Sequence, residues 1–152
     1  MKKHILLADY IKVADIHAQR LQGALEQSDH FMPLSADQLA ILPLDQLSFL
    51  DMITMRFGKL QDVMGSKIFS LILDVLGEDA ASLIDKLNKL EKLGYIHDVN
   101  WWMDLREIRN QVMHDYPDDY EIIVSHLVML TIKANELLLF WGKLKKKIST
   151  LP

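Results

Sequence analysis

The chain has no cysteine and few glycines or prolines. Among 152 residues there are 6 glycines, 4 prolines and 0 cysteines. The lack of cysteine excludes disulfides, thiolate chemistry and cysteine-based zinc sites. The sequence also contains no Gly-rich phosphate loop, no nucleotide-binding fingerprint and no Ser-His-Asp candidate. No cofactor is therefore expected. No metal site is expected either, because the following histidines are not spaced as ligands of one metal ion: His4, His17, His30, His97 and His126.

Long apolar runs and an excess of positive charge are missing as well. The N-terminus begins like a signal peptide, but Asp9 and Lys12 end its apolar run too early. Fully apolar stretches are only a few residues long, so no segment is expected to span a bilayer and a cytoplasmic location is predicted. The net charge of −4 argues against a general nucleic-acid coat protein. The one dense basic run, 143–147, is either a helix end that complements the macrodipole or an RNA-steering patch.

The hydrophobic pattern is helical almost throughout, and no window alternates as a strand would. With no internal repeat and no long linker, residues 1–152 are predicted to form a single domain. We expect an all-α bundle of four long helices, one medium helix and a short extra turn. The predicted helices cover residues 4–27, a short helix capped at Ser35, 44–76, 80–93, 101–115 and 118–147.

Local signals fix several ends of these helices. Ser35 with a Gln three residues later offers a capping box, and Gly94 is well placed to end the 80–93 helix. Asp98 or Asn100 caps the helix that follows. Gly58 and Gly65 interrupt the long 44–76 helix and indicate close helix contacts or a bend.

The segment 106–117 departs from this packing pattern. It combines Arg109, Asn110, His114 and Tyr116 near the end of a predicted helix, before Pro117. Residues four apart lie about 40° apart on a helix, so Asn110 and His114 share a face, whereas residues five apart lie about 140° apart. Arg109 and His114 therefore converge only if the last helical turn loosens before Pro117, or if two copies of the chain meet.

These residue types fit metal-independent RNA cleavage. A histidine that titrates near neutrality can exchange a proton with the ribose 2′-hydroxyl, and Arg109 stays charged and presents a planar fork of donors to a phosphate. Asn110 would orient either group. The alternative is structural: Arg109 pairs with a carboxylate and His114 caps the helix. Trp101 and Trp102 are read as core and rim residues rather than as a base-stacking platform.

The pattern Arg109-Asn110-x-x-x-His114-x-Tyr116 resembles the HEPN superfamily. That signature is an Arg, usually a polar residue after it, and a His four to six residues later. HepT-like toxins, encoded beside MntA-type nucleotidyltransferase antitoxins, add the Tyr two places after the His. The match is specific over residues 106–117, and helix count and order support it.

The resemblance implies an endoribonuclease toxin with a HEPN-like four- to five-helix bundle that works as a homodimer. Arg109 and His114 would be the catalytic pair, with Asn110 in support. Tyr116 would be the residue that the cognate MntA-like nucleotidyltransferase antitoxin adenylylates. RNA would be the substrate, with no membrane partner. The dimer interface is expected to include the 101–116 helix and to bury Trp101, Trp102 or Met113.

Two other readings stay open. HEPN-like bundles also serve as non-catalytic, substrate-binding partner subunits of nucleotidyltransferases. A helical adaptor with no small-molecule site is the third reading, supported only by the long apolar stripes.

Overall fold

The computed structural model describes residues 1–114 and 119–152, and every regular element in these residues is helical. This confirms the predicted all-α bundle. In chain order the elements are α1 (Lys2–Ser28), α2 (Ala36–Ala40), α3 (Leu44–Val63), the π-helical turn η1 (Met64–Ile68), α4 (Phe69–Val75), α5 (Leu83–Lys92), α6 (Val99–Met113) and α7 (Tyr120–Ile148).

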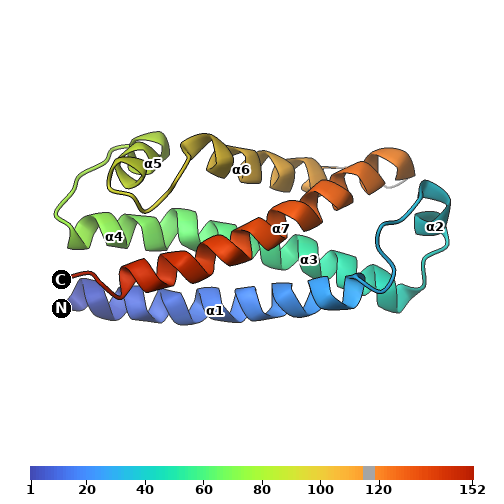
Figure 1. The fold of residues 1–152 in the computed structure, drawn as a ribbon, viewed down its shortest axis with the longest axis horizontal. Helices are drawn as coiled ribbons and strands as arrows, with labels where there is room; N and C mark the ends of the chain where they lie inside the picture. Colours follow the sequence, from blue (N-terminus) through green and yellow to red (C-terminus); the bar gives the residue numbers. More distant parts are fainter. Residues whose placement is uncertain (115–118) are drawn as a thin grey trace.

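Three long helical runs form the body of the bundle (Figure 1). Helix α1 lies along α3 and α4, which form one continuous rod through η1. Helix α7 crosses this pair diagonally, and α6 packs against both α3 and α7. The two chain ends lie together, where the His4 ring nitrogen Nε2 is 2.7 Å from the carbonyl oxygen of Pro152.

Local caps place most helix ends where the sequence predicts them. The capping box at Ser35 is present: its hydroxyl accepts from the Gln38 N–H at 3.1 Å, and the Gln38 side chain accepts from the Ser35 N–H at 2.9 Å. Gly94 follows α5 with a φ of 82°, as predicted for a glycine after a helix end. Helix α5 begins at Leu83 rather than Ala80, because Ser82 is its cap. Of the two candidates, Asp98 caps α6, which therefore starts at Val99.

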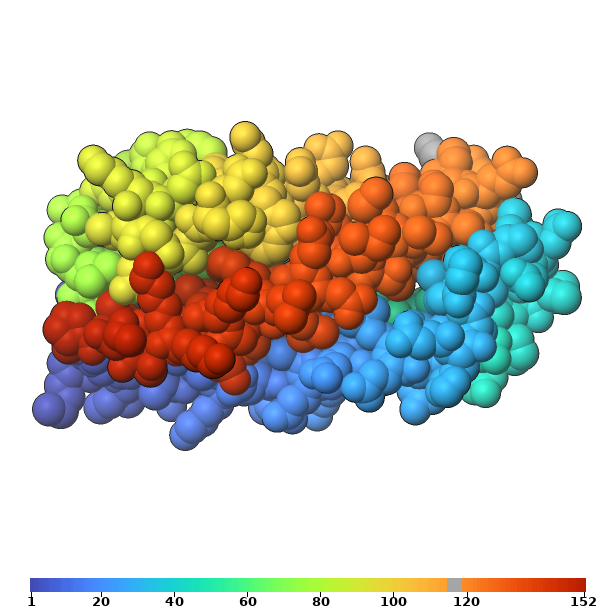
Figure 2. Space-filling view, viewed as in Figure 1, coloured from blue at the N-terminus to red at the C-terminus, as the bar shows by residue number. Residues whose placement is uncertain are grey.

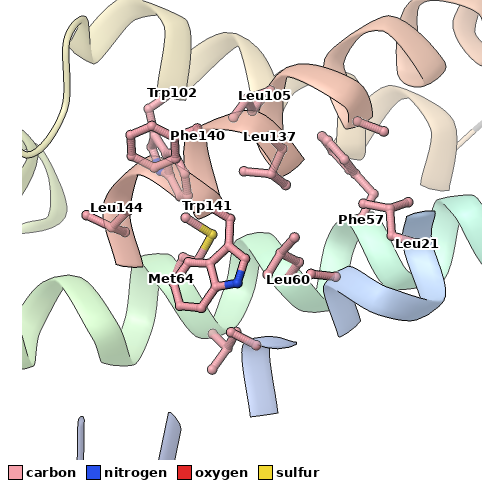
Figure 3. Packing of buried hydrophobic residues seen from close by; sticks show 14 of the residues in the cluster. Leu21, Phe57, Leu60, Met64, Trp102, Leu105, Leu137, Phe140, Trp141 and Leu144 are labelled. Atoms are coloured by element: carbon pink, nitrogen blue, oxygen red, sulfur yellow. The ribbon is translucent and has the colours of Figure 1, made fainter. Parts of the chain in front are cut away.

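The core is a continuous apolar layer between the helices (Figure 3). Trp102 is fully buried, with its ring centroid 4.7 Å from that of Phe69 and 6.2 Å from that of Phe140. Trp101 packs against both rings, with its centroid 5.0 Å from that of Phe140 and 6.2 Å from that of Trp102. Both tryptophans are buried, so the prediction of a core position is confirmed, whereas the expectation of a rim position and of a place in the dimer interface is wrong.

Two of the four lysines in the basic run near the end of α7 contact neighbouring parts of the chain. Lys145 pairs with Asp15 of α1 at 2.9 Å. Lys147 donates to the carbonyl oxygen of Gly94 at 2.7 Å and lies over the Tyr95 ring at 4.6 Å. These contacts support the helix-end reading of the run rather than an open basic patch.

Helix α7 is long, apolar and only partly covered (Figure 2). Its most apolar 18-residue window has a mean hydropathy of 1.6, and 22% of that window is buried. By length and composition alone, it is the one helix among the described residues that could cross a membrane, a test that core helices also pass. The expectation that no segment meets this test was wrong. Several large apolar side chains of α7 remain exposed: Ile122, Met129, Ile132 and Leu139.

Candidate functional site

Helix α6 carries three of the four motif residues. Arg109 and Asn110 lie near its end, and His114 is its C-cap, with φ −114° and ψ 11°. The His114 backbone N–H donates to the carbonyl of Gln111 at 3.2 Å. Tyr116, the predicted modification target, lies outside the described residues.

Arg109 is positioned by helix α3. Its guanidinium Nη2 lies 3.0 Å from Asp62 Oδ2, and the two side chains are 36% and 52% exposed. The Arg109 stem crosses the backbone at Gly58, where an added Cβ would lie 3.2 Å from Arg109 Nε. Gly58 therefore permits the close approach that the sequence indicated. The carboxylate pairing foreseen in the structural alternative exists, but it uses a single one of the five guanidinium N–H donors.

A cavity of about 350 Å³ opens beside this ion pair, between α3, η1, α5 and α6. Three cationic side chains line it, Lys86, Arg106 and Arg109, against the single carboxylate of Asp62. Arg106 is exposed and has no ion-pair partner within residues 1–114 and 119–152. In a chain with a net charge of −4, this excess of positive charge is a local feature that favours an anionic ligand.

The π-helical turn η1 forms part of the cavity lining. Gly65 and Ser66 of η1 line the cavity, and a Cβ at Gly65 would lie 3.5 Å from Trp102 Cζ2. Gly65 therefore lets the rod pass close to the indole, which forms another part of the lining. Short π-helical segments occur often at functional sites. The sequence signalled this turn only through a glycine inside a predicted helix.

Gln61 of α3 is a residue of the cavity that the sequence analysis missed. It is 3% exposed, and neither Nε2 nor Oε1 of its amide has a hydrogen-bond partner among the described residues. The other buried polar residue of the described chain, Ser28, donates to the Leu25 carbonyl at 2.9 Å. Gln61 stands out because buried polar atoms are normally paired.

The structure brings Arg109 and Asn110 together at the cavity, but His114 does not line it. His114 is exposed and also does not line the neighbouring depression of about 360 Å³ that Arg109 borders with Gly58 and Met113. Helix α6 is α-helical to Met113, and the chain leaves that conformation at His114, whose backbone N–H bonds three residues back rather than four. A shallow groove of about 310 Å³ continues from the cavity along α6 past Asn110, one helical turn before His114.

Within the described residues, no group of three or more His, Asp or Glu side chains could hold a metal ion. The chain matches no protein-family model, and it has no significant match among curated proteins or solved structures.

Proposed function

We propose that this chain is a metal-independent endoribonuclease of the HEPN type, in which Arg109 and His114 act on the RNA phosphodiester. The observation that carries the proposal is the cationic cavity beside Arg109 in an otherwise acidic protein. Arg109 is held by Asp62 yet remains more than a third exposed, so it retains donors for a phosphate oxygen. Asn110 lines the same cavity.

In this proposal His114 is the general base. It takes the proton from a ribose 2′-hydroxyl, the 2′ oxygen attacks phosphorus, and the bond from phosphorus to the 5′ oxygen of the next nucleotide breaks. The leaving oxygen takes a proton from an imidazolium. Arg109 stabilises the charge that develops on the phosphoryl oxygens. The products are a 2′,3′-cyclic phosphate and a 5′-hydroxyl end.

We further propose that two copies of the chain build the cleft. Within one chain His114 does not line the cavity, and a second copy of the chain would bring a histidine to an Arg109. The exposed apolar residues of α7, together with Met103 and Met113 of α6, support such an interface, since burying apolar area contributes roughly 25 cal/mol per Å². The tryptophans expected there are buried in the core, so the interface would use these methionines and the α7 residues instead.

The regulatory part of the proposal rests on sequence. Tyr116 precedes Pro117, which biases Tyr116 toward an extended backbone beyond the helix end. A nucleotidyltransferase partner that attached an adenylyl group to its hydroxyl would add negative charge and bulk beside the cleft. The modified toxin would then repel RNA phosphates.

A second candidate function is a non-catalytic, nucleotide-binding subunit of a nucleotidyltransferase. The observation that favours it is that the cavity forms within one chain without His114. This candidate predicts nucleotide binding without RNA cleavage.

The test is cleavage of end-labelled single-stranded RNA by purified protein in EDTA. The proposal expects a 2′,3′-cyclic phosphate product from wild type and none from Arg109→Ala or His114→Ala. Arg20→Ala and His30→Ala, on exposed residues of α1 and the following turn, are the matched controls and should cleave normally. A mixture of the two inactive variants should regain part of the activity if two copies share the cleft. Activity that requires a divalent metal, or that survives in His114→Ala, would refute the proposal.

A further inference from the structure

The end of the bundle that carries α2 exposes apolar side chains that the fold does not bury. Figure 1 shows α2 and the loops on either side of it at the end opposite the two chain termini. Ile41 and Leu44 are 83% and 81% exposed, more than any other large apolar residue of the described chain except Met1. Leu34 and Leu39 of the same segment are buried, so the segment is anchored to the core. The exposure of Ile41 and Leu44 therefore belongs to a fixed surface.

These two residues lie at an apolar groove of about 460 Å³. Ile41 lines the groove, and Leu44 follows the lining residue Pro43 in the chain. Single exposed apolar residues are common on protein surfaces, whereas a contiguous apolar area indicates a site that binds a partner. The apolar lining of the groove comes from Phe31, Met32, Leu34, Ile41, Leu42 and Pro43.

The charge around the groove is negative. Residues 21–55 contain no lysine or arginine. Asp29, Asp37 and Asp45, here called the acidic rim, are exposed, and each directly precedes a residue that lines the groove. None of the three has an ion-pair partner among the residues that the structure describes. His30 is the one titratable residue in the described part of the lining. This charge disfavours an anionic occupant, such as RNA or an acidic lipid surface, and favours a basic one.

The elements around the groove indicate the shape of the occupant. Every regular element of the described residues is helical, so those residues offer no strand edge that could pair with an extended peptide. A proline-rich segment would need a groove lined by several aromatic rings, and Phe31 is the one aromatic residue in the described lining. The remaining common mode is an amphipathic helix that lays its apolar face in the groove, with contacts at every third or fourth residue.

We propose that this surface, the α2 groove of residues 30–46, binds a basic amphipathic helix of a partner protein. The apolar face of that helix covers Ile41 and Leu44, and its basic residues lie beside the acidic rim. The proposal goes beyond the ribonuclease function, because neither Arg109 nor His114 lines this groove.

The experiment measures binding of a fluorescent peptide to the full chain by anisotropy. The probe is a designed helix of about 18 residues built from leucine and lysine, with the leucines on one face. One control peptide has glutamate in place of each lysine, and another has a scrambled order with no apolar face. The leucine–lysine peptide should bind at least about tenfold more tightly than either control, because each control loses the charge match or the apolar face. Its affinity should decrease as the salt concentration rises.

Variants of exposed residues locate the bound peptide without disturbing the core. Ile41→Ser and Leu44→Ser should each weaken binding about tenfold or more, as expected when an anchor residue is removed from an interface. Leu139→Ser on α7 is the matched control. Leu139 is 70% exposed and does not line the groove, so this variant should bind the peptide as wild type does.

The double variant Asp37→Asn with Asp45→Asn tests the acidic rim. It should weaken binding roughly fivefold and make the affinity depend less on salt. The double variant Asp9→Asn with Asp104→Asn removes the same charge at exposed positions of α1 and α6. This control should bind the peptide as wild type does, which separates the acidic rim from the net charge of the chain.

Two outcomes would overturn the inference directly: wild-type binding by both Ile41→Ser and Leu44→Ser, or equal binding of the three peptides. A second copy of the chain is another occupant that the groove could take. Sedimentation in which Ile41→Ser dissociates a wild-type oligomer would assign the groove to a contact between copies and would also overturn the inference. RNA cleavage by Ile41→Ser should equal that of wild type, so failure of the ribonuclease proposal leaves this test intact.

Discussion

Adding one methyl group at Gly58 should displace Arg109 while leaving the stability of the fold almost unchanged. The new Cβ would lie 3.2 Å from Arg109 Nε and 3.7 Å from its Cγ, so the arginine stem must move by a few tenths of an ångström. The bond of 3.0 Å to Asp62 would then lengthen or break. The displaced guanidinium no longer meets the phosphate as the proposed chemistry requires.

Two opposing effects on the free energy of unfolding nearly cancel. Replacing glycine by alanine inside a helix contributes about 1 kcal/mol. Losing a partly exposed ion pair, such as that of Arg109 with Asp62, costs at most about 1 kcal/mol. The midpoint of thermal unfolding should therefore stay within about 4 °C of wild type. RNA cleavage should fall about tenfold to hundredfold, because small misplacements of a catalytic group reduce rates strongly.

Gly23→Ala is the matched control. Gly23 lies inside α1, and nothing stands within 4 Å of an added Cβ. The Gly23→Ala variant should be about 1 kcal/mol more stable than wild type, because alanine favours a helix more than glycine does, and it should cleave RNA like wild type. Thermal unfolding followed by circular dichroism and a fluorogenic RNA assay measure both variants. Wild-type cleavage by Gly58→Ala would refute the view that α3 positions Arg109 for the reaction.

Three further predictions concern other parts of the chain. The pKa of His17 is lowered from 6.5, first by burial and then by nearby cations including Arg56, whose Nη1 lies 2.9 Å from His17 Nδ1. As the pH falls, His17 is therefore protonated in the unfolded chain before it is protonated in the folded chain. The free energy of unfolding should decrease as the pH falls below about 6.5. Denaturant titrations of His17→Gln at several pH values should show a free energy of unfolding that depends less on pH. Trp141→Phe removes the hydrogen bond of 2.8 Å to Asp15 and should lower that free energy by about 1–2 kcal/mol; an unchanged urea midpoint would contradict this. Tyr116→Phe should cleave RNA yet escape adenylylation, and mass spectrometry that finds the adduct on another tyrosine would defeat the assignment.

The ends of the helices could be predicted because their signals are local. The capping box at Ser35 and the glycine at Gly94 act on residues within one turn, so the sequence contains all that is needed. The few errors at helix starts follow from the choice among neighbouring polar residues, as with Ser82 and Asp98.

The faces of the helices were harder to predict. Ile5, Val13 and Ile16 keep helical spacing in α1, yet they are 58%, 41% and 46% exposed. The buried face of α1 includes Ala14 and Ala18 instead, because α1 packs closely along α3. Small residues give a weak hydrophobic signal, and the close packing that favours them depends on distant parts of the chain.

The candidate site could be predicted only along one helix. The motif on α6 was found because its residues stand close together in sequence. Gln61 and Asp62 come from α3, and no sequence pattern brings them to Arg109 before the fold is known. The sequence left two routes for His114 to reach Arg109, a loosened last turn and a second copy of the chain. Within one chain His114 lines neither depression beside Arg109, which makes the dimer the first route to test.

The most direct test of the ribonuclease proposal is the cleavage rate of single-stranded RNA in EDTA for wild type, Arg109→Ala and His114→Ala, measured on the same folded preparations. Loss of a general base or of a charge-stabilising donor lowers rates by about 10² or more. The proposal predicts such a loss in both variants, with circular dichroism spectra that match wild type. Equal cleavage by wild type and His114→Ala, or no cleavage by wild type at any RNA concentration tested, would contradict it.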